Sequence, residues 1–397
     1  MAVAPSQPGS QSELRAANRS RIVDLLRSRG PMTQAELARA SGLSPATVSS
    51  IAHELRDEEW VVDEDLEGAR GRALALSRDA GLAVGIAFGH SHVRVAIADL
   101  AHTILAETED RLDTDHGSAE EGIALAASLF RRLVAEGDVD LGLVTGVGMG
   151  LPGPLRRDTG QVGDSAILPG WIASHPAELM REELGLDVTV ENDANLGALA
   201  EIVWGAGRGR SDLLYLKIST GVGAGLILGG RLYHGHAGTA GEIGHTTVDE
   251  TGAICRCGSR GCLETFAGAD AILEPLRRRH GPELTIREVV RMAEGGDAGC
   301  QRVIADAGHA VGRAVADACN LLAPEQVVIG GDLARSGDLL LDPVRAAIAR
   351  STIGAVREIP VTTGTLGERA DVLGAVALVL RDSERFVAQP SWVDNRA

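Results

Sequence analysis

The chain has 397 residues, of which 44% are hydrophobic, so it can bury a large core and form two or three domains. Its formal net charge of −17 argues against general nucleic-acid binding, because lysine and arginine supply most of the non-specific affinity for phosphate. The polar start of the chain and the lack of an apolar run near about 18 residues argue against a signal segment and a membrane span. We therefore expect a soluble, cytoplasmic protein with no membrane partner, whose residues 1–10 form a disordered tail.

Residues 11–80 have the pattern of a winged helix-turn-helix. An apolar stripe over about 12–29 predicts a first helix. Thr33 and Glu36 form a capping box, which predicts the start of a short second helix, and Gly42 predicts the turn that ends it.

A third helix and a β-hairpin complete this pattern. Ser44 and Pro45 provide an N-cap and a proline at the first helical position, which predicts a helix over about 45–57. Apolar segments at 60–62 and 73–76 predict the two strands of a wing. The third helix is therefore the candidate recognition helix for the major groove of DNA.

The charge of this N-terminal part differs from that of the whole chain. Residues 11–52 contain six arginines and three acidic residues, which gives a local charge of +3. The alternative is a small helical packing module without DNA contact, but spacing, caps and arginine content agree with one another. The residues predicted to contact bases or phosphates are Arg21, Thr33, Ser44, Thr47, Ser49, Ser50, His53, Arg70 and Arg72.

Beyond residue 80, strand patterns alternate with helical patterns, which predicts an α/β domain with a mostly buried sheet. The predicted strands span 83–88, 93–98, 143–148, 188–191, 213–218, 224–228 and 327–329, and the predicted helices span about 119–135, 297–322 and 371–382. The polar segment 191–195 follows a strand and precedes a helix. It therefore lies at the edge where α/β sheets bind ligands.

Three cysteines and one histidine lie close together in the sequence, and they form a complete ligand set for zinc. His245, Cys255, Cys257 and Cys262 would occupy four tetrahedral positions and leave none open for water, which indicates a structural site and not a catalytic one. Ordinary buried or reactive thiols are the alternative. A disulfide fits less well, because nothing else in the chain indicates an oxidising compartment.

Two long motifs resemble those of the ROK family, which comprises repressors, open reading frames and sugar kinases. Residues 244–264, Gly-His-x9-Cys-x-Cys-Gly-x2-Gly-Cys-x-Glu, resemble its zinc motif, and the pattern Ile218-Ser-Thr-Gly221-Val-Gly223-Ala-Gly225 is similar to its glycine signature. The resemblance covers about residues 82–385. Family members that regulate transcription carry a DNA-binding module in front of this region.

The resemblance implies a fold, an assembly and domain boundaries. The fold would be α/β, an N-terminal winged helix-turn-helix followed by a two-lobed actin-like (ribonuclease-H-like) sugar kinase fold. The DNA-binding domain would span 11–80, the first lobe 81–192 plus 371–397, and the second lobe 193–370. The protein would be a homodimer or homotetramer.

By the same resemblance, five residues would bind a sugar between the lobes: Asn192, Asp193, Glu242, His245 and Glu264. In the kinases the aspartate at position 193 is the base that takes a proton from the sugar hydroxyl, so Asp193 is a vestigial base here. His245 would coordinate zinc through one ring nitrogen and contact the sugar through the other. The alternative is a set of helix caps and solvated carboxylates, which is less convincing for five residues in register.

The phosphate side departs from the family pattern. Kinases of the family carry Asp-x-Gly-Gly-Thr on the first hairpin, whereas this chain has Ala87-Phe-Gly-His90-Ser. Alanine cannot hold magnesium, and a histidine ring stands where the loop should be bare. The remaining nucleotide-side candidates are Thr220, Gly221, Gly223, Gly330 and Gly331, whose glycines can also serve the turns alone. We therefore expect zinc as a structural cofactor, and no ATP or magnesium.

These observations favour a sugar-responsive transcription regulator of repressor type. It would bind operator DNA through its N-terminal module and a sugar effector in the cleft between its lobes, without catalysing a reaction. The alternative is an ATP-dependent, glucokinase-like sugar kinase with an appended DNA-binding domain. Ala87 distinguishes the two, although it leaves residual kinase activity open.

Overall fold

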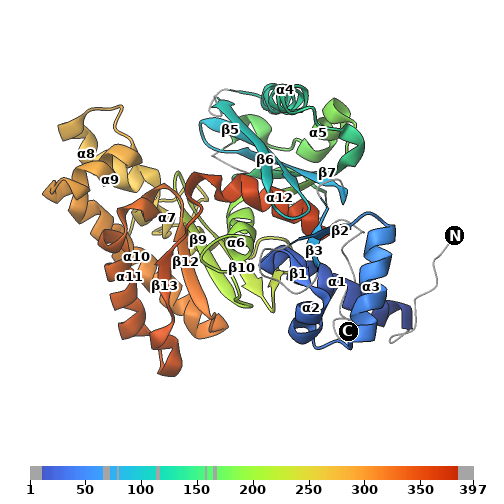
Figure 1. Cartoon of the computed structure of the whole chain (residues 1–397). Helices are drawn as coiled ribbons and strands as arrows, with labels where there is room; N and C mark the ends of the chain where they lie inside the picture. Colours follow the sequence, from blue (N-terminus) through green and yellow to red (C-terminus); the bar gives the residue numbers. More distant parts are fainter. Residues whose placement is uncertain are drawn as a thin grey trace.

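The computed structural model describes residues 11–65, 72–77, 80–112, 117–156, 159–163 and 168–382. Within these residues the strands form one three-stranded and two five-stranded sheets (Figure 1). The tail 1–10, Arg70 and the segment 383–397 that was assigned to the first lobe lie outside the described residues. In this part of the chain, no helix combines the length and the apolar character that a membrane span requires.

The N-terminal unit is a winged helix, as the sequence predicted. Thr33 and Glu36 form the expected capping box, and Gly42 ends the second helix in the left-handed conformation with φ 71°. Ser44 caps the third helix by accepting a hydrogen bond from the Thr47 amide. The elements are α1 (Gln11–Arg29), β1 (Met32–Thr33), α2 (Gln34–Ser41), α3 (Pro45–Asp57), β2 (Val61–Glu64) and β3 (Ala73–Leu76), with sheet order β1-β3-β2.

A compact apolar core holds the winged helix together. Val48, Ile51 and Leu55, the predicted apolar face of α3, are at most 2% exposed. They pack with Leu37 of α2 and with Trp60, at the start of the wing. The opposite face of α3 is consequently turned to solvent, which is what a recognition helix requires.

The first five-stranded sheet has the order β6-β5-β4-β7-β8. Its strands are β4 (Leu82–Phe88), β5 (His92–Asp99), β6 (Ile104–Arg111), β7 (Val144–Leu151) and β8 (Val188–Asn192). The helices α4 (Ala119–Gly137) and α5 (Pro176–Leu184) cover one face, where Phe130 and Trp171 are buried. The sequence did not predict β6, because this edge strand is rich in acidic side chains that are mostly exposed and lacks an apolar pattern.

The second five-stranded sheet has the order β11-β10-β9-β12-β13. Its strands are β9 (Leu213–Ile218), β10 (Val222–Leu228), β11 (Arg231–Leu232), β12 (Gln326–Gly330) and β13 (Val361–Thr363). A helical layer packs against it, formed by α7 (Glu264–Ala267), α8 (Ala269–His280), α9 (Ile286–Glu294), α10 (Ala298–Leu322) and α11 (Asp338–Ser351). Short 3-10 helices include η4 (Ile243–His245), η5 (Asp332–Ser336) and η7 (Gly367–Arg369).

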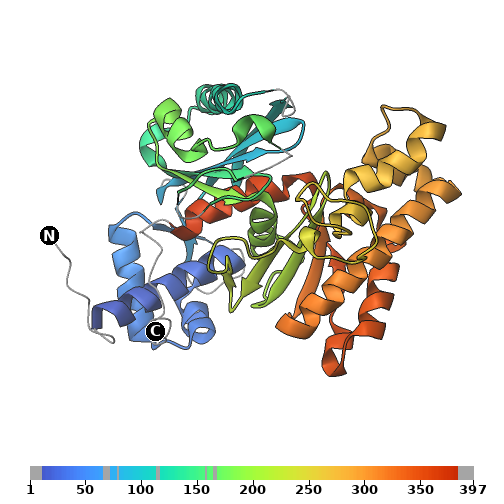
Figure 2. The same ribbon diagram turned by 180° about the vertical axis from the view of Figure 1, so that it is seen from behind.

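Two helices occupy the space between the five-stranded sheets. α6 (Asp193–Val203) and α12 (Ala370–Asp382) pack against each other, and α12 also packs on β4 and β7 (Figure 2). Glycines allow this close approach: a Cβ on Gly374 would lie 2.0 Å from the Leu196 carbonyl oxygen, and one on Gly148 would lie 2.0 Å from the Ala375 carbonyl oxygen. The winged helix lies near the C-terminal end of α12.

Candidate functional site

Residues from both five-stranded units line a large cleft with a volume of about 2030 Å³. The cleft brings together all five predicted sugar-binding residues: Asn192, Asp193, Glu242, His245 and Glu264. It also collects Thr220, Gly221, Gly223 and Gly331 from the predicted nucleotide side. Gly330 lies apart from this lining, against the ring of the buried Tyr215.

The N-terminus of α6 opens into the cleft, and Asn192 is its N-cap. The Asn192 side-chain oxygen accepts hydrogen bonds from the amides of Ala194 and Asn195, and its amide group donates to the Gly153 carbonyl oxygen at 3.0 Å. The helix-cap interpretation that the sequence left open thus describes these contacts of Asn192. Asp193, the next residue, points its second carboxylate oxygen at a cation instead.

That cation is Lys217, the only lysine in the chain. Its ammonium group donates to Asp193 at 2.6 Å and to Asp371, at the start of α12, at 2.5 Å. Burial alone would lower the pKa of Lys217, but the charges of the two aspartates outweigh burial and raise the pKa above its ordinary value. Asp193 is therefore a carboxylate held in an ion pair with Lys217.

Sequence reasoning assigned no role to Lys217 or Asp371. The available signal was a charged residue in the otherwise apolar strand Leu213–Ile218. That signal does not identify the partners, which lie 24 and 154 residues away along the chain.

A second buried pair supports the same end of the cleft. One carboxylate oxygen of Glu191 accepts from the Asn192 amide and the Asn195 side chain, and the other contacts His234 Nε2 at 2.6 Å. Burial raises the pKa of Glu191, but the hydrogen bonds from His234 and Asn195 outweigh it, so the pKa lies below its ordinary value. This pair ties the β8–α6 junction to the segment that follows β11.

The predicted metal ligands converge. The ligand atoms of His245, Cys255, Cys257 and Cys262 all lie within 4.8 Å of one another. His245 Nδ1 is 3.7 Å from Cys255 Sγ, and the Sγ atoms of Cys257 and Cys262 are also 3.7 Å apart. A tetrahedral zinc ion with Zn–S bonds of about 2.3 Å would set its sulfur ligands about 3.8 Å apart. The four residues could therefore hold a metal ion together.

Two glycines shape the loop that carries the cysteines. Gly258 and Gly261 have φ of 87° and 64°, in the left-handed region. A Cβ on Gly261 would lie only 1.6 Å from the Asp249 carbonyl oxygen. Gly261 is thus required for the close return of the chain that brings Cys262 to the other ligands.

His245 connects the metal cluster to the cleft. Its Nδ1 faces Cys255, whereas its Nε2 lies 3.8 Å from a carboxylate oxygen of Glu242. Glu264 accepts a hydrogen bond from the Val222 amide and forms an ion pair with Arg256. Sequence reasoning overlooked Arg256, whose position between Cys255 and Cys257 was the available signal.

The first hairpin of the α/β region is closed by a backbone hydrogen bond and a histidine ring. The Gly89 amide donates to the His92 carbonyl oxygen at 2.8 Å, and a Cβ on Gly89 would lie 2.5 Å from the His92 ring. The ring that covers the loop is thus that of His92 and not that of His90, which the sequence had suggested and which is exposed. Ala87 is 5% exposed and belongs to an apolar cluster.

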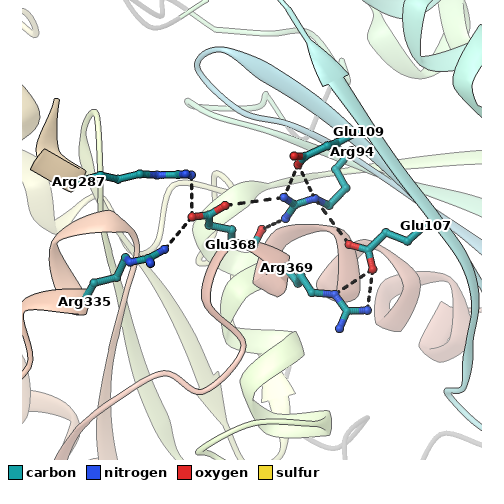
Figure 3. A network of polar contacts seen from close by, with 7 residues as sticks. All are labelled: Arg94, Glu107, Glu109, Arg287, Arg335, Glu368 and Arg369. Atoms are coloured by element: carbon teal, nitrogen blue, oxygen red, sulfur yellow. Dashed lines mark hydrogen bonds and ion pairs between the residues drawn. The ribbon is translucent and has the colours of Figure 1, made fainter. Parts of the chain in front are cut away.

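Ion pairs span the cleft on this side (Figure 3). Arg94 of β5 has a side chain that is only 9% exposed, and it contacts the carboxylates of Glu107, Glu109 and Glu368. Glu368 also pairs with Arg287 of α9 at 2.6 Å and with Arg335 of η5 at 2.8 Å. The Glu368 carboxylate therefore connects the first sheet to the helical layer of the second. We call these residues the Arg94 network.

The winged helix presents a polar surface on α3. Ser49, Ser50 and His53 are exposed and Thr47 is half-buried. Arg72, in front of β3, is also exposed, and its guanidinium is 3.6 Å from Asp65. Ser49, Ser50 and His53 thus lie on the solvent-facing side of the predicted recognition helix.

Other basic and polar residues of this domain have partners within it. Arg21 donates to the Ser41 carbonyl oxygen at 3.1 Å, at the end of α2, and Thr33 and Ser44 are N-caps. Arg15 forms an ion pair with Glu54 of α3, and Arg19 forms one with Glu58, the C-cap of this helix. The local positive charge that the sequence indicated is thus partly neutralised by acidic residues beyond position 52.

A winged helix followed by a two-lobed α/β cleft with a His/Cys cluster defines a class of protein, the regulators built on a sugar kinase fold. The sequence model of the ROK family matches residues 83–382, and that of the MarR family matches residues 17–65. The chain belongs to the ROK family, with a MarR-type winged helix in front of the ROK domain.

Three relatives illustrate the similarity. The chain is 28% identical to the xylose repressor of Caldicellulosiruptor bescii, over 95% of this chain and 99% of that protein. It is 35% identical to a glucokinase of Halalkalibacterium halodurans, over 75% of this chain and 94% of that protein. A crystal structure of a ROK family transcriptional regulator, a homologue of the E. coli MLC protein, shares the fold, with a TM-score of 0.79, 24% identity and coverage of 95% and 98% of the two chains.

Proposed function

We propose that this protein is a sugar-responsive transcription regulator of repressor type. Its winged helix binds operator DNA, and a sugar effector in the cleft changes the affinity for that DNA. The observation that carries the proposal is the exposed polar face of α3 in front of a kinase-like cleft. The similarity supports it, because the xylose repressor matches 95% of this chain, whereas the glucokinase matches 75%.

The sugar site of the proposal lies at the N-terminus of α6. Asp193, Glu242, His245 and Glu264 converge on the cleft and offer the acceptors that a hydroxyl-rich ligand needs. Asn192 takes part mainly by fixing the first turn of α6, since its side-chain oxygen caps the helix. The relative named for xylose does not identify the sugar of this protein.

Zinc is the proposed structural cofactor. The chemistry of the donor set, three sulfurs and one imidazole nitrogen, and their separations fit tetrahedral zinc. Zinc would stabilise the loop from 245 to 262 and fix the orientation of His245, whose other ring nitrogen faces Glu242 in the cleft.

The alternative, a sugar kinase, has support from the glucokinase relative. Against it stand the alanine at position 87, the His92 ring on Gly89, and the ion pair that occupies Asp193. These features argue for a cleft that binds a sugar without ATP or magnesium.

The assembly and the domain boundaries are part of the proposal. We assign 11–80 to DNA binding, 81–192 plus 371–397 to the first lobe and 193–370 to the second. A homodimer or homotetramer would place two winged helices on an operator with two-fold symmetry, with half-sites about one helical turn, or a multiple of it, apart. Arg72 would reach phosphate or the minor groove from the wing.

Selection of binding sites from random duplex DNA, followed by titration with a panel of pentoses, hexoses and N-acetylated sugars, tests the function. We expect the selection to yield one DNA site with two-fold symmetry. One class of sugar should change the affinity of the protein for this site by at least about 5-fold. Ser49→Glu, which adds a negative charge to the exposed face of α3, should weaken operator binding at least tenfold and leave the thermal shift by sugar unchanged. Asp193→Ala should lose the sugar response and keep operator binding.

A coupled assay of ATP turnover with the same sugars is the control. Sustained phosphorylation that disappears in Asp193→Asn would establish the kinase and refute a purely regulatory role. Operator binding that Ser49→Glu leaves intact would refute the assignment of α3 as the recognition helix.

A further inference from the structure

We propose that Trp204 is the positioning residue that transmits sugar binding in the cleft to the DNA-binding domain. It would act through the turn between β5 and β6, which touches the winged helix. This inference rests on the proposed function and names the route by which its two sites are coupled. The route consists of α6, Trp204 at its C-terminal end, and the turn formed by residues 99–103.

α6 begins in the sugar site. Asn192 caps it, and Asp193 in its first turn is paired with Lys217. With 11 residues the helix is about 16 Å long. Every residue from Ala194 to Glu201 is buried, so the helix is enclosed along most of its length.

α6 is packed tightly against the second sheet. A Cβ on Gly197 would lie 2.3 Å from the Tyr215 ring of β9, and one on Gly225 of β10 would lie 2.5 Å from the Ala194 carbonyl oxygen. Because these contacts leave no room for the helix to slide, a displacement at Asp193 moves α6 as a rigid body together with β9 and β10. The displacement therefore reaches the far end of the helix.

Trp204 is the C-cap of α6. Its indole Nε1 donates to the His102 carbonyl oxygen at 3.2 Å, and the Trp204 and His102 rings lie 4.7 Å apart between centroids. Glu201, which is 1% exposed, holds the same end of the helix by accepting from the amides of Ala206, Thr365 and Leu366. Trp204 is thus held at a fixed place against the turn.

The turn itself belongs to the first sheet and is internally braced. Asp99 is 1% exposed, and its side chain accepts from the Thr103 amide at 2.8 Å. The His102 amide donates to the Asp99 carbonyl oxygen at 3.0 Å, and His102 itself has φ 67°, in the left-handed region. A non-glycine residue keeps a left-handed conformation only when its surroundings hold it there. A displacement of His102 would therefore also displace its neighbours in the turn.

One of those neighbours contacts the DNA-binding domain. Ala101 packs against the hydrophobic core of the winged helix, which contains Leu26, Leu37 and Leu74. The contact between Trp204 and His102 therefore joins the sugar-binding helix to a turn whose adjacent residue touches the winged helix. If the two sheets move relative to each other when sugar binds, the contact between Ala101 and the DNA-binding domain would change, and with it the position of that domain.

The experiment measures three dissociation constants of the full-length, zinc-loaded protein. The first is the dissociation constant for the selected operator without sugar, and the second is the constant for the same operator with saturating sugar. The third is the dissociation constant for the sugar in the absence of DNA. The ratio of the two operator constants is the coupling factor, which is typically about 5 to 150 in regulated systems. The variants are Trp204→Ala, Trp204→Phe, which keeps a ring and loses the N–H donor, and His102→Ala, which keeps the carbonyl acceptor.

We expect Trp204→Ala to reduce the coupling factor to less than twofold. Sugar affinity and sugar-free operator affinity should stay within about threefold of wild type, because Trp204 lines neither site. Trp204→Phe should restore part of the factor, and His102→Ala should reduce it. Leu321→Ala is the matched control, since this apolar residue is 85% exposed at the end of α10, and it should behave as wild type.

The outcomes separate this inference from the proposed function. A wild-type factor above 5 that persists in both Trp204→Ala and His102→Ala overturns this inference alone. A wild-type factor of 1 overturns the proposed regulation and the inference with it. If Trp204→Ala does not fold, His102→Ala and Trp204→Phe decide between the two outcomes.

Discussion

Ion pairs determine how the acidic side chains of the cleft are used. Asp193 is paired with Lys217, Glu191 with His234, and Glu264 with Arg256. A buried carboxylate without such a partner would tend to take up a proton, because burial disfavours the charged form. Burial does raise the pKa of Glu242, whose neighbour is His245. The cleft therefore presents several carboxylate acceptors held in place by basic partners, which suits recognition of hydroxyl groups.

The pair between Glu191 and His234 makes stability depend on pH. The pKa of Glu191 lies below its ordinary value of 4.5, so the ionised side chain contributes stability above about pH 4.5, and this contribution is lost as the pH falls through the lower folded-state pKa. We expect Glu191→Gln to lower the free energy of unfolding by about 1–3 kcal/mol at pH 7 and by progressively less below pH 4.5. Thermal unfolding of both proteins from pH 8 to 4 measures the difference.

The comparison also controls for other titrating groups. Loss of metal in acid affects wild type and variant alike, so only their difference reports on Glu191. A difference that stays constant to pH 4, or grows there, contradicts the assignment. Glu183→Gln, at a more exposed carboxylate that pairs with Arg131, should change stability by less than about 1 kcal/mol at every pH.

Among the elements, the loop from 245 to 262 depends least on regular secondary structure. His245 ends the 3-10 helix η4, and residues 246–262 contain the isolated β-bridges Thr247↔Cys262 and Ile254↔Arg260 but no helix or named strand. Such a segment gains little from backbone ladders, so its conformation must be held by side chains. The His/Cys cluster supplies the means, since a bound metal joins four points of the loop at once.

Removal of one ligand should therefore release the metal and loosen the loop. We expect wild type to contain about one zinc ion per chain and Cys257→Ser to contain almost none, with a loss of several kcal/mol in unfolding free energy. Metal analysis of the purified proteins and thermal unfolding with and without a chelator provide the measurements. Cys319→Ala, at a buried cysteine outside the cluster, should retain zinc. Native protein that lacks zinc would remove the claim.

Across the whole molecule, long-range polar contacts join the two sheets. Lys217 connects β9 to α12 through Asp371, and the Arg94 network connects β5 and β6 to α9 and η5 (Figure 3). Both lie on the lining of the cleft or at its margin. The protein's own side chains thus hold the two units together here.

The Arg94 network contains a buried arginine and an exposed one, so the contribution of each to stability can be compared. Arg94 is 9% exposed and Arg287 is 57% exposed. We expect Arg94→Gln to lower the free energy of unfolding by about 1–3 kcal/mol, because it removes a buried cation that contacts three carboxylates and donates a hydrogen bond to the Glu368 carbonyl oxygen. Arg287→Gln should cost less than about 1 kcal/mol, and this cost should shrink at high salt. Denaturant unfolding at two salt concentrations checks both, and equal losses would contradict the description of Arg94 as the centre.

Sequence alone determined the features that depend on neighbours in the chain. The helices of the winged helix begin and end where Thr33, Gly42 and Ser44 predicted, because caps act within three or four residues. The strands with apolar patterns were predicted because their pattern is also local. The four metal ligands could be recognised because they fall within 18 positions of one another. The edge strand β6 escaped detection because it carries no apolar face to mark it.

Only the tertiary structure decided which distant residues meet. Lys217 and Asp371 are 154 residues apart, and Arg94 donates to the Glu368 carbonyl oxygen across 274 residues. The structure likewise placed the ring of His92, and not that of His90, against Gly89. It also showed that Arg21 donates a hydrogen bond to the end of α2. The physical reason is that ion pairs and ring contacts depend on distance in space. That distance is set by the packing of α6 and α12 between the sheets, for which a single sequence holds no local signal.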